Sequence, residues 1–387
     1  MSQYREEKDS MGPVRIPADM LYGAQTERAR QNFPISRLRF DRRFLYALGV
    51  IKRAAAEVNE DLGLLDAERA GAIKQAAQEM MDGDLDAHFV LDIFQTGSGT
   101  STNMNANEVL ANRANLILGG EVGTKEPVHP NDHVNMGQSS NDVIPTAVHV
   151  SALFAVEGEL IPALTHLHRA LEAKADEFDG VYKAGRTHLQ DATPMRLGQE
   201  FGGYASQVKH GIGRVERARD SLRELAIGGT AVGTGINTHP EFGSRMAEKI
   251  SAITGVKFCE AENHFEAQAA RDATVEMSGM LKVVACSLMK IANDLRWLAS
   301  GPRTGIGELN LPELQPGSSI MPGKVNPVMA ELVNVVAFRV IGNDTSVMLA
   351  AKAGQLQLNA YEPLEAMAIL DSQRLMTNTM RTLREKC

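Results

Sequence analysis

Apolar side chains repeat in alternating steps of four and three between residues 277 and 298, and this spacing restricts the fold more than any other feature of the chain. The positions are Met277, Leu281, Val284, Leu288, Ile291, Leu295 and Leu298. Steps of four and three place side chains on one stripe of an α-helix, here over about six turns. A stripe of this length must be buried against other helices, so the spacing predicts a long-helix bundle.

The same period recurs elsewhere, so the predicted fold class is mainly all-α. A second stripe consists of Leu160, Leu164, Leu167, Leu171, Ala175 and Phe178. Its helix is expected to begin near Asn141, with Pro145 in the first turn and a kink at Pro162. Further helices are expected over about 194–225, over about 328–351 and after Pro363. Stripes this long also favour packing against partner chains.

The first 138 residues have a different organisation. They contain shorter predicted helices, over about 40–62 and about 65–82, and several turn-rich loops. We therefore expect a smaller N-terminal domain over residues 1–138 and a central long-helix bundle domain over residues 139–387. The sequence shows no internal repeat and no flexible linker.

Composition argues against a nucleic-acid-binding, membrane-spanning or disulfide-rich protein. The chain of 387 residues has a formal net charge of −8, without the basic stripe of a nucleic-acid binder. Its polar N-terminus lacks the apolar core of a signal peptide, and no apolar run approaches the roughly 18 residues of a membrane span. Three scattered cysteines form neither a disulfide framework nor a zinc pattern. We expect a cytoplasmic protein that binds neither membrane nor nucleic acid.

Four loops rich in hydroxyls, amides and glycines interrupt the helices. They are TGSGTSTNMN at 96–105, GQSSND at 137–142, GRTHLQDATP at 185–194 and GSSIMPGKVNP at 317–327. Each loop could simply cap a helix, since serine and asparagine are good N-caps. Four such loops in one chain favour a polar anionic ligand instead, because hydroxyls and backbone N–H groups donate to carboxylate oxygens.

The 317–327 loop contains the residues that most clearly suggest a ligand-binding function. Its prolines exclude a continuous helix and its glycines permit unusual dihedral angles, so we expect a loop that could close over a ligand. Lys324 supplies a cation and Asn326 a directional amide. In the third loop, His188 is the best acid/base candidate, because imidazole can exchange a proton near neutral pH.

Two other patterns are weaker. His129 and His133 have the spacing of a metal pair, but Pro130 lies between them and HPNDH reads as a turn. GGTAVGTG at 228–235 superficially matches a dinucleotide-binding loop, but its spacing differs and no strand is predicted before it. Neither pattern favours a metal site or a dinucleotide site.

GSSIMPGKVNP resembles the signature of the fumarase/aspartase superfamily of lyases. QTGSGTSTNMNANEV, HPNDHVNMGQSSNDVIPTA, GRTHLQDATP, GGTAVGTGINTHPEF and SLMKIANDLRWLASGPRTGIGE resemble the class II fumarases within it. The resemblance extends from about residue 5 to the end of the chain. It implies a homotetramer with a twenty-helix core, composite active sites from three subunits, and no cofactor. The family's small C-terminal domain is expected to be absent here.

The resemblance also implies roles for individual residues. Ser318 would be the base that removes a proton from the substrate's methylene carbon, and His188 the partner on the hydroxyl side, supported by Glu331. The two substrate carboxylates would be held by Ser98, Thr100, Ser139, Ser140, Asn141, Thr187, Ser319, Lys324 and Asn326. A second anion site would be formed by His129, Asn131 and Asp132. Where the family often has an arginine upstream of His129, this chain has Lys125, Glu126 and Pro127.

The implied reaction is the reversible hydration of fumarate to L-malate through an aci-carboxylate intermediate. One alternative is aspartate ammonia-lyase activity, because GTSTNMNANEV, NPVMAELVN and AGQLQLNAYEP are closer to aspartases. Another is an inert scaffold of the same fold, against which the intact Ser318, Lys324 and His188 argue. The expected partners are a small dicarboxylate and further copies of the chain.

Overall fold

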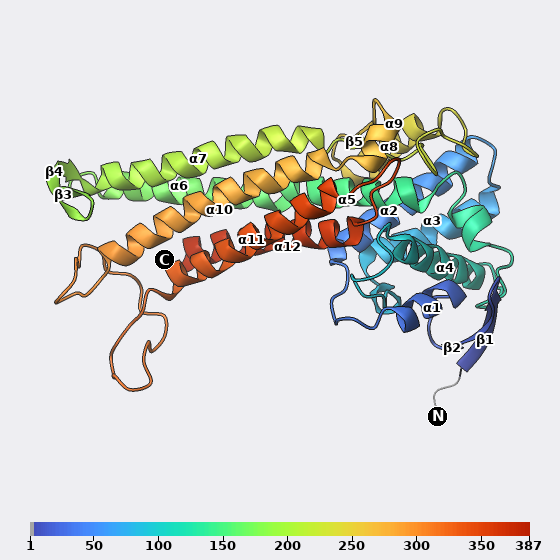
Figure 1. The fold of residues 1–387 in the computed structure, drawn as a ribbon, viewed down its shortest axis with the longest axis horizontal. Coiled ribbons are helices and arrows are strands. Elements are labelled where there is room, and N and C mark those ends of the chain that lie inside the picture. Colours follow the sequence, from blue (N-terminus) through green and yellow to red (C-terminus); the bar gives the residue numbers. More distant parts are fainter. Residues whose placement is uncertain (1–3) are drawn as a thin grey trace. The chain divides into compact units, whose positions relative to one another are not determined.

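The computed structural model describes residues 4–387 and is mainly helical (Figure 1). The α-helices are α1 (Ala24–Asn32), α2 (Arg42–Asp61), α3 (Ala67–Asp82), α4 (Thr100–Ile117), α5 (Ser140–Ala155), α6 (Ile161–Glu177), α7 (Leu197–Ser221), α8 (Phe242–Thr254), α9 (His264–Ala269), α10 (Asp272–Leu298), α11 (Val328–Lys352) and α12 (Glu362–Lys386). The mainly all-α fold predicted from the apolar period is confirmed.

Short elements complete the chain. They are the 3-10 helix η1 (Asp86–His88), the π-helices η2 (Pro130–Val134) and η3 (Val156–Leu160), and the strands β1 (Tyr4–Asp9), β2 (Gly12–Pro17), β3 (Tyr182–Thr187), β4 (Gln190–Arg196), β5 (Glu224–Leu225) and β6 (Cys259–Glu260). β1 pairs with β2 and β3 with β4, both antiparallel, whereas β5 and β6 are parallel.

Two predictions about local structure were wrong. The loop predicted at 185–194 is largely the β3–β4 hairpin, whose short alternating pattern was too weak to read as strands. A strand does precede the 228–235 loop, but β5 has only two residues and is not followed directly by a helix, as a dinucleotide site requires. The irregularity expected at Pro162 lies just before it, where η3 separates α5 from α6.

The chain forms two compact units, each made of three segments. Unit 1 comprises residues 1–154, 221–275 and 346–370, and unit 2 comprises residues 155–220, 276–345 and 371–387. The division at residue 138 expected from the sequence concerns the domains of the family and stays a prediction.

In unit 1, α2 is the central helix. Asp41 caps it by accepting the backbone N–H of Arg43, and its buried face packs against α3 and α8. Thirteen of its residues are buried, including Phe44, Leu48 and Ile51, which have no exposed surface. This apolar core holds α4 and the loops at the N-termini of α4 and α5 in place.

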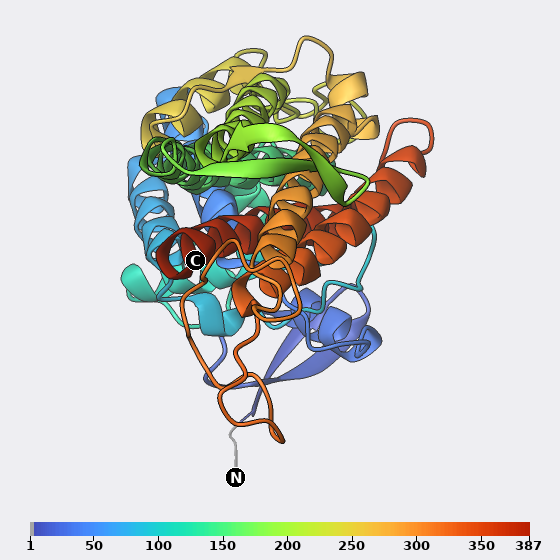
Figure 2. The same ribbon diagram turned by 90° about the vertical axis from the view of Figure 1, so that its left-hand side faces the viewer.

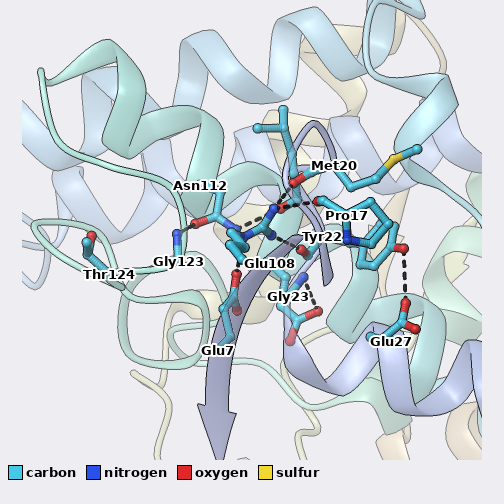
Figure 3. Close-up of polar contacts among 12 residues, drawn as sticks. Glu7, Pro17, Met20, Tyr22, Gly23, Glu27, Glu108, Asn112, Gly123 and Thr124 are labelled. Carbon is cyan, nitrogen blue, oxygen red and sulfur yellow. Dashed lines mark hydrogen bonds and ion pairs between the residues drawn. The ribbon is translucent and has the colours of Figure 1, made fainter. Parts of the chain in front are cut away.

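Polar contacts fix the N-terminal hairpin and α1 to α4 (Figure 3). The Glu108 carboxylate accepts the backbone N–H groups of Gly23 at 2.8 Å and Gln25 at 2.9 Å, which are otherwise unpaired at the start of α1. Asn112, one turn further along α4, accepts the N–H of Gly123 at 2.8 Å. These side chains fix α4, whose first residue is the site candidate Thr100.

Unit 2 is a bundle of long helical segments from α6, α7, α10, α11 and α12, which lie side by side in both views (Figures 1 and 2). The seven residues of the 277–298 stripe are all at most 6% exposed, which confirms the predicted seam. Polar contacts fix the register between helices, for example Tyr204 Oη donating to Asp294 at 2.9 Å and Asn334 donating to Asn293 at 2.8 Å.

Among residues 4–387, two helical stretches are long and apolar enough to span a membrane by length and composition, which the sequence analysis did not anticipate. In the most apolar 18-residue part of Ser140–Glu177, 67% of the residues are buried within the protein, as expected of a core helix. In the corresponding part of Val328–Lys352 only 33% are buried, and large apolar side chains of this helix such as Val335 and Phe338 face outward.

Candidate active site

The first polar loop ends at the N-terminus of α4. Gly99 has a φ of 68°, which favours glycine, and a Cβ atom at this position would lie 2.9 Å from the side chain of Ile144. The hydroxyls of Ser98 and Thr100 lie 2.9 Å apart. The N-terminus of a helix carries partial positive charge because its first N–H groups have no partner within the helix. The Ser98 and Thr100 hydroxyls therefore lie at a position where an anion would bind favourably.

The 137–142 loop ends at the N-terminus of α5 and is held by Asp142. This fully buried carboxylate accepts the backbone N–H groups of Ser139 at 2.9 Å, Gly228 at 3.1 Å and Thr230 at 2.9 Å. Asn141 donates to Ala231 O at 2.7 Å. These contacts hold the 228–235 loop, which only superficially matches a nucleotide-binding motif, against the 137–142 loop.

Burial of Asp142 disfavours the ionised form of its carboxyl group. Burial raises the pKa of Asp142 to about 6, although three backbone N–H donors act in the opposite direction. Protonation of the Asp142 carboxyl would leave one of the three N–H donors with a poor acceptor. Because these donors lie in the 137–142 and 228–235 loops, a substitution of Asp142 is expected to affect both loops.

The proposed second anion segment is a tight turn around η2. His129 Nδ1 accepts the N–H groups of Asn131 and Asp132, each at 3.2 Å. The Asp132 carboxylate lies 3.3 Å from the same Nδ1. Arg69 of α3 donates to Pro127 O at 2.7 Å, which brings a guanidinium to this segment from elsewhere in the chain.

In unit 2, His188 occupies the tip of the β3–β4 hairpin. His188 and Leu189 have φ values of 53° and 60°, and two successive positive angles form the turn that matches the twist of a hairpin. Neither residue is glycine, so this backbone is strained at the position of the predicted acid/base residue. The imidazole is exposed and Thr187 ends β3 beside it.

The 317–327 segment is an irregular loop with defined internal contacts, as the sequence predicted. Gly317 N donates to Lys324 O at 2.8 Å, and Asn326 Nδ2 donates to Gly317 O at 2.8 Å. Ser318 Oγ accepts two backbone N–H groups, from Ile320 at 3.3 Å and Met321 at 3.1 Å. Donors aimed at a hydroxyl oxygen stabilise its alkoxide form, which is the form a serine base requires.

Lys324, Asn326 and Glu331 line one open hollow of about 510 Å³ in unit 2. The hollow also includes Arg296 and Trp297 at the end of α10, and Glu331 stands in the first turn of α11. A lysine, an arginine and an amide around one open space suit a small carboxylate ligand.

One anchoring residue of this region was missed by the sequence analysis. Glu308 forms ion pairs with Lys183 at 2.6 Å and Arg186 at 2.6 Å, and so ties the segment before the 317–327 loop to β3. Nothing in the local sequence around Glu308 indicates these partners, because the pairing joins residues more than 100 positions apart.

The candidates are divided between the two units. Unit 1 contains Ser98, Thr100, Ser139, Ser140, Asn141 and the His129 segment, and unit 2 contains Thr187, His188, Ser318, Ser319, Lys324, Asn326 and Glu331. Among residues 4–387, no cluster of three or more His, Cys, Asp or Glu side chains is arranged to hold a metal ion. The expectation of no cofactor remains a prediction.

Comparison with known proteins identifies the family. The lyase family matches residues 12–342. The class II fumarate hydratase of Halobacterium salinarum is 60% identical over 383 residues, which cover 99% of this chain and 81% of that protein. The mitochondrial fumarate hydratase of Schizosaccharomyces pombe is 54% identical over 100% of this chain and 74% of that protein.

This chain belongs to the class II fumarate hydratase family of lyases.

Solved structures agree with this assignment. The recombinant class II fumarase of Schistosoma mansoni superposes with a TM-score of 0.97 at 41% identity, covering 100% of this chain and 84% of that one. A fumarate lyase:delta crystallin from Brucella melitensis, in a crystal with cobalt, gives a TM-score of 0.96 at 47% identity, over 100% of this chain and 84% of that one. The resemblance read from the six sequence motifs is therefore confirmed, and the fold is that of the family.

Proposed function

We propose that this protein catalyses the reversible hydration of fumarate to L-malate. The observation that carries the proposal is the 54–60% identity, along essentially the whole chain, to several curated proteins named fumarate hydratase. The polar loops agree with this chemistry, because their hydroxyls, amides and cations suit a small dicarboxylate.

In the proposed mechanism, Ser318 starts the dehydration of malate. Its alkoxide takes a proton from the methylene carbon, and the electron pair of the C–H bond moves onto the adjacent carboxylate to form an aci-carboxylate. The N–H groups of Ile320 and Met321, which already point at Ser318 Oγ, support the alkoxide. Lys324 and Asn326 would meet the developing charge, and one such preorganised donor is worth about 2.7–4 kcal/mol in comparable sites.

Loss of hydroxide completes the reaction. The C–O bond breaks, the electron pair of the aci-carboxylate forms the double bond of fumarate, and His188 delivers a proton so that water departs. We assign Glu331 to support His188, because an acidic partner favours the protonated imidazole. The two substrate carboxylates would be bound by hydroxyls and amides at Ser98, Thr100, Ser139, Ser140, Asn141, Thr187 and Ser319. His129, Asn131 and Asp132 would form a second anion site.

The proposed active form is a homotetramer with composite active sites. Outward apolar side chains on α11 support an assembly: Val335 is 63% exposed and Phe338 59% exposed. Such side chains on a long helix are costly in water unless another chain covers them. A cytoplasmic location is also proposed; some relatives are named mitochondrial, such as that of Schizosaccharomyces pombe.

A substrate comparison tests the function. Fumarate formation is followed by its ultraviolet absorbance after adding L-malate, and separately L-aspartate, to the purified protein. Turnover of malate alone is expected. Turnover of aspartate alone would assign the protein to the ammonia-lyases of the superfamily, and no turnover of either substrate would favour an inert scaffold.

A further inference from the structure

A lysine that is not part of the proposed mechanism is fully buried beneath the 137–142 loop. Lys52 of α2 has no exposed surface. Its ammonium donates to Asn135 Oδ1 at 3.0 Å and to Gln138 Oε1 at 2.9 Å. Both acceptors are neutral amides, although a buried lysine is normally paired with a carboxylate.

The side-chain amides of Asn135 and Gln138 connect Lys52 to the 137–142 loop. Asn135 Oδ1 also accepts from Asn103 Nδ2 at 3.2 Å, and the same Asn103 Nδ2 lies 3.1 Å from Ser140 Oγ. Asn135 Nδ2 donates to Gln138 O at 3.0 Å, immediately before Ser139. Lys52 therefore lies at the centre of an amide network that shapes residues 134–140.

The positive charge of Lys52 is not neutralised by direct contact. Within the described residues, no carboxylate oxygen lies within ion-pair distance of its ammonium. The charged group that acts on it is Asp142, whose oxygens are occupied by three backbone N–H groups. Several other charges on α2 and the helices packed on it pair with one another: Lys74 with Glu60, Lys249 with Glu57 and Asp61, and Arg53 with Glu57.

We propose that Lys52 is a positioning residue that shapes the Ser139–Asn141 loop and supplies a buried positive charge for the substrate dianion. The inference rests on the proposed dicarboxylate function. A charge in the low-dielectric interior acts more strongly than one in water, and a protein of net charge −8 needs local compensation for a dianion. Burial lowers the pKa of Lys52 to about 7, so a bound anion would favour its protonated form.

The first test is Lys52→Met, which keeps the length and apolar stem of the side chain and removes its charge. We expect the KM for L-malate to rise on the order of tenfold, with kcat within about threefold, because a charge felt equally by bound substrate and transition state acts on binding. The control is Lys74→Met, whose part-exposed ammonium pairs with Glu60 at 2.6 Å; its KM should stay within about twofold.

A second pair of variants covers the case in which Lys52→Met does not fold. Gln138→Glu keeps an acceptor for Lys52 but neutralises its charge, whereas Gln138→Met loses the same amide donors without adding a charge. Binding is read as the increase in melting temperature caused by succinate, a dicarboxylate that cannot be dehydrated. The increase should be much smaller for Gln138→Glu than for Gln138→Met.

The two readouts separate this inference from the proposed function. If the wild-type protein does not turn over malate, the proposed function fails, while succinate-induced stabilisation still tests the role of Lys52. A folded Lys52→Met variant with wild-type KM and wild-type stabilisation by succinate would overturn the inference. Equal stabilisation of Gln138→Glu and Gln138→Met, or no stabilisation of the wild type by succinate, would also overturn it.

Discussion

At the scale of single residues, the environment of each polar group decides whether it can act. Ser318 Oγ accepts two backbone N–H groups, an arrangement that stabilises negative charge on oxygen. Glu362 is the opposite case: both of its carboxylate oxygens are buried without a hydrogen-bond partner in the described residues. The surroundings of Ser318 Oγ therefore favour its charged form, whereas burial of Glu362 raises the pKa of its carboxyl and favours the neutral form.

Replacing Ser318 by alanine should remove catalysis without affecting the fold. We expect kcat for malate dehydration to fall by on the order of 10³ or more, because the proposed proton acceptor is lost. The melting temperature should change little, because Ser318 is only partly buried and the N–H groups of Ile320 and Met321 can bond to water instead. Ser206→Ala, an exposed serine on α7, is the control and should retain full activity. Wild-type kcat in Ser318→Ala would remove Ser318 from the mechanism.

Glu362 predicts a pH dependence of stability. Burial raises its pKa well above the ordinary value, so the folded protein holds a proton that the unfolded chain releases above pH ~4.5. This contribution is fully present below that pH and is lost as pH rises towards the folded pKa. Glu362→Gln should therefore flatten the decline in the free energy of unfolding between pH 5 and 8, measured with urea.

The control for this prediction is the neighbouring Glu365. It forms a buried ion pair with Arg271 at 3.1 Å, so Glu365→Gln leaves an uncompensated charge and should cost about 3–5 kcal/mol at neutral pH. An unchanged pH profile in Glu362→Gln would contradict the assignment of a neutral Glu362.

At the scale of elements, helix N-termini and their loops are held by distant segments of the chain. The 96–99 loop lies against the start of α12 and the residue Ala360 before it: Glu362 N donates to Gly97 O at 3.0 Å. A Cβ atom on Gly97 would lie 1.5 Å from Ala360 O, closer than any real contact. Only glycine fits here, so the position of the loop depends on residues some 260 positions later.

Gly97→Ala should therefore displace the loop that carries Ser98 and Thr100. We expect kcat/KM for malate to fall at least about tenfold, because substrate-positioning groups tolerate displacements of well under 1 Å. The matched control is Gly71→Ala on α3, where a Cβ would meet no atom within 4 Å. That change should leave activity unaltered and raise stability by roughly 0.5–1 kcal/mol. A wild-type kcat/KM in Gly97→Ala would contradict this prediction, because it would show that activity does not depend on the position of the 96–99 loop.

At the scale of the whole molecule, the outward apolar face of α11 favours assembly. A single chain leaves Val335 and Phe338 more than half exposed, which water disfavours. In the most apolar 18-residue part of this helix, only 33% of the residues are buried.

Phe338→Glu should disrupt the proposed tetramer. A charge placed in an apolar interface is costly unless it is paired, so the mass measured by light scattering should fall and malate turnover should fall with it. Met11→Glu, on the exposed β1–β2 turn, is the control and should change neither quantity. A Phe338→Glu protein that keeps both the mass and the turnover of the wild type would place the interface elsewhere.

The sequence by itself determined the long helices, the buried 277–298 stripe, the irregular 317–327 loop and the family, because periodicity and short motifs are local properties of a chain. Only the tertiary structure revealed Lys52 under the 137–142 loop, Asp142 joining that loop to 228–230, and Glu308 paired with β3. These roles depend on burial and on contacts between residues far apart in the sequence. Lys52 is one of several lysines until folding removes water from its ammonium and surrounds it with amide oxygens.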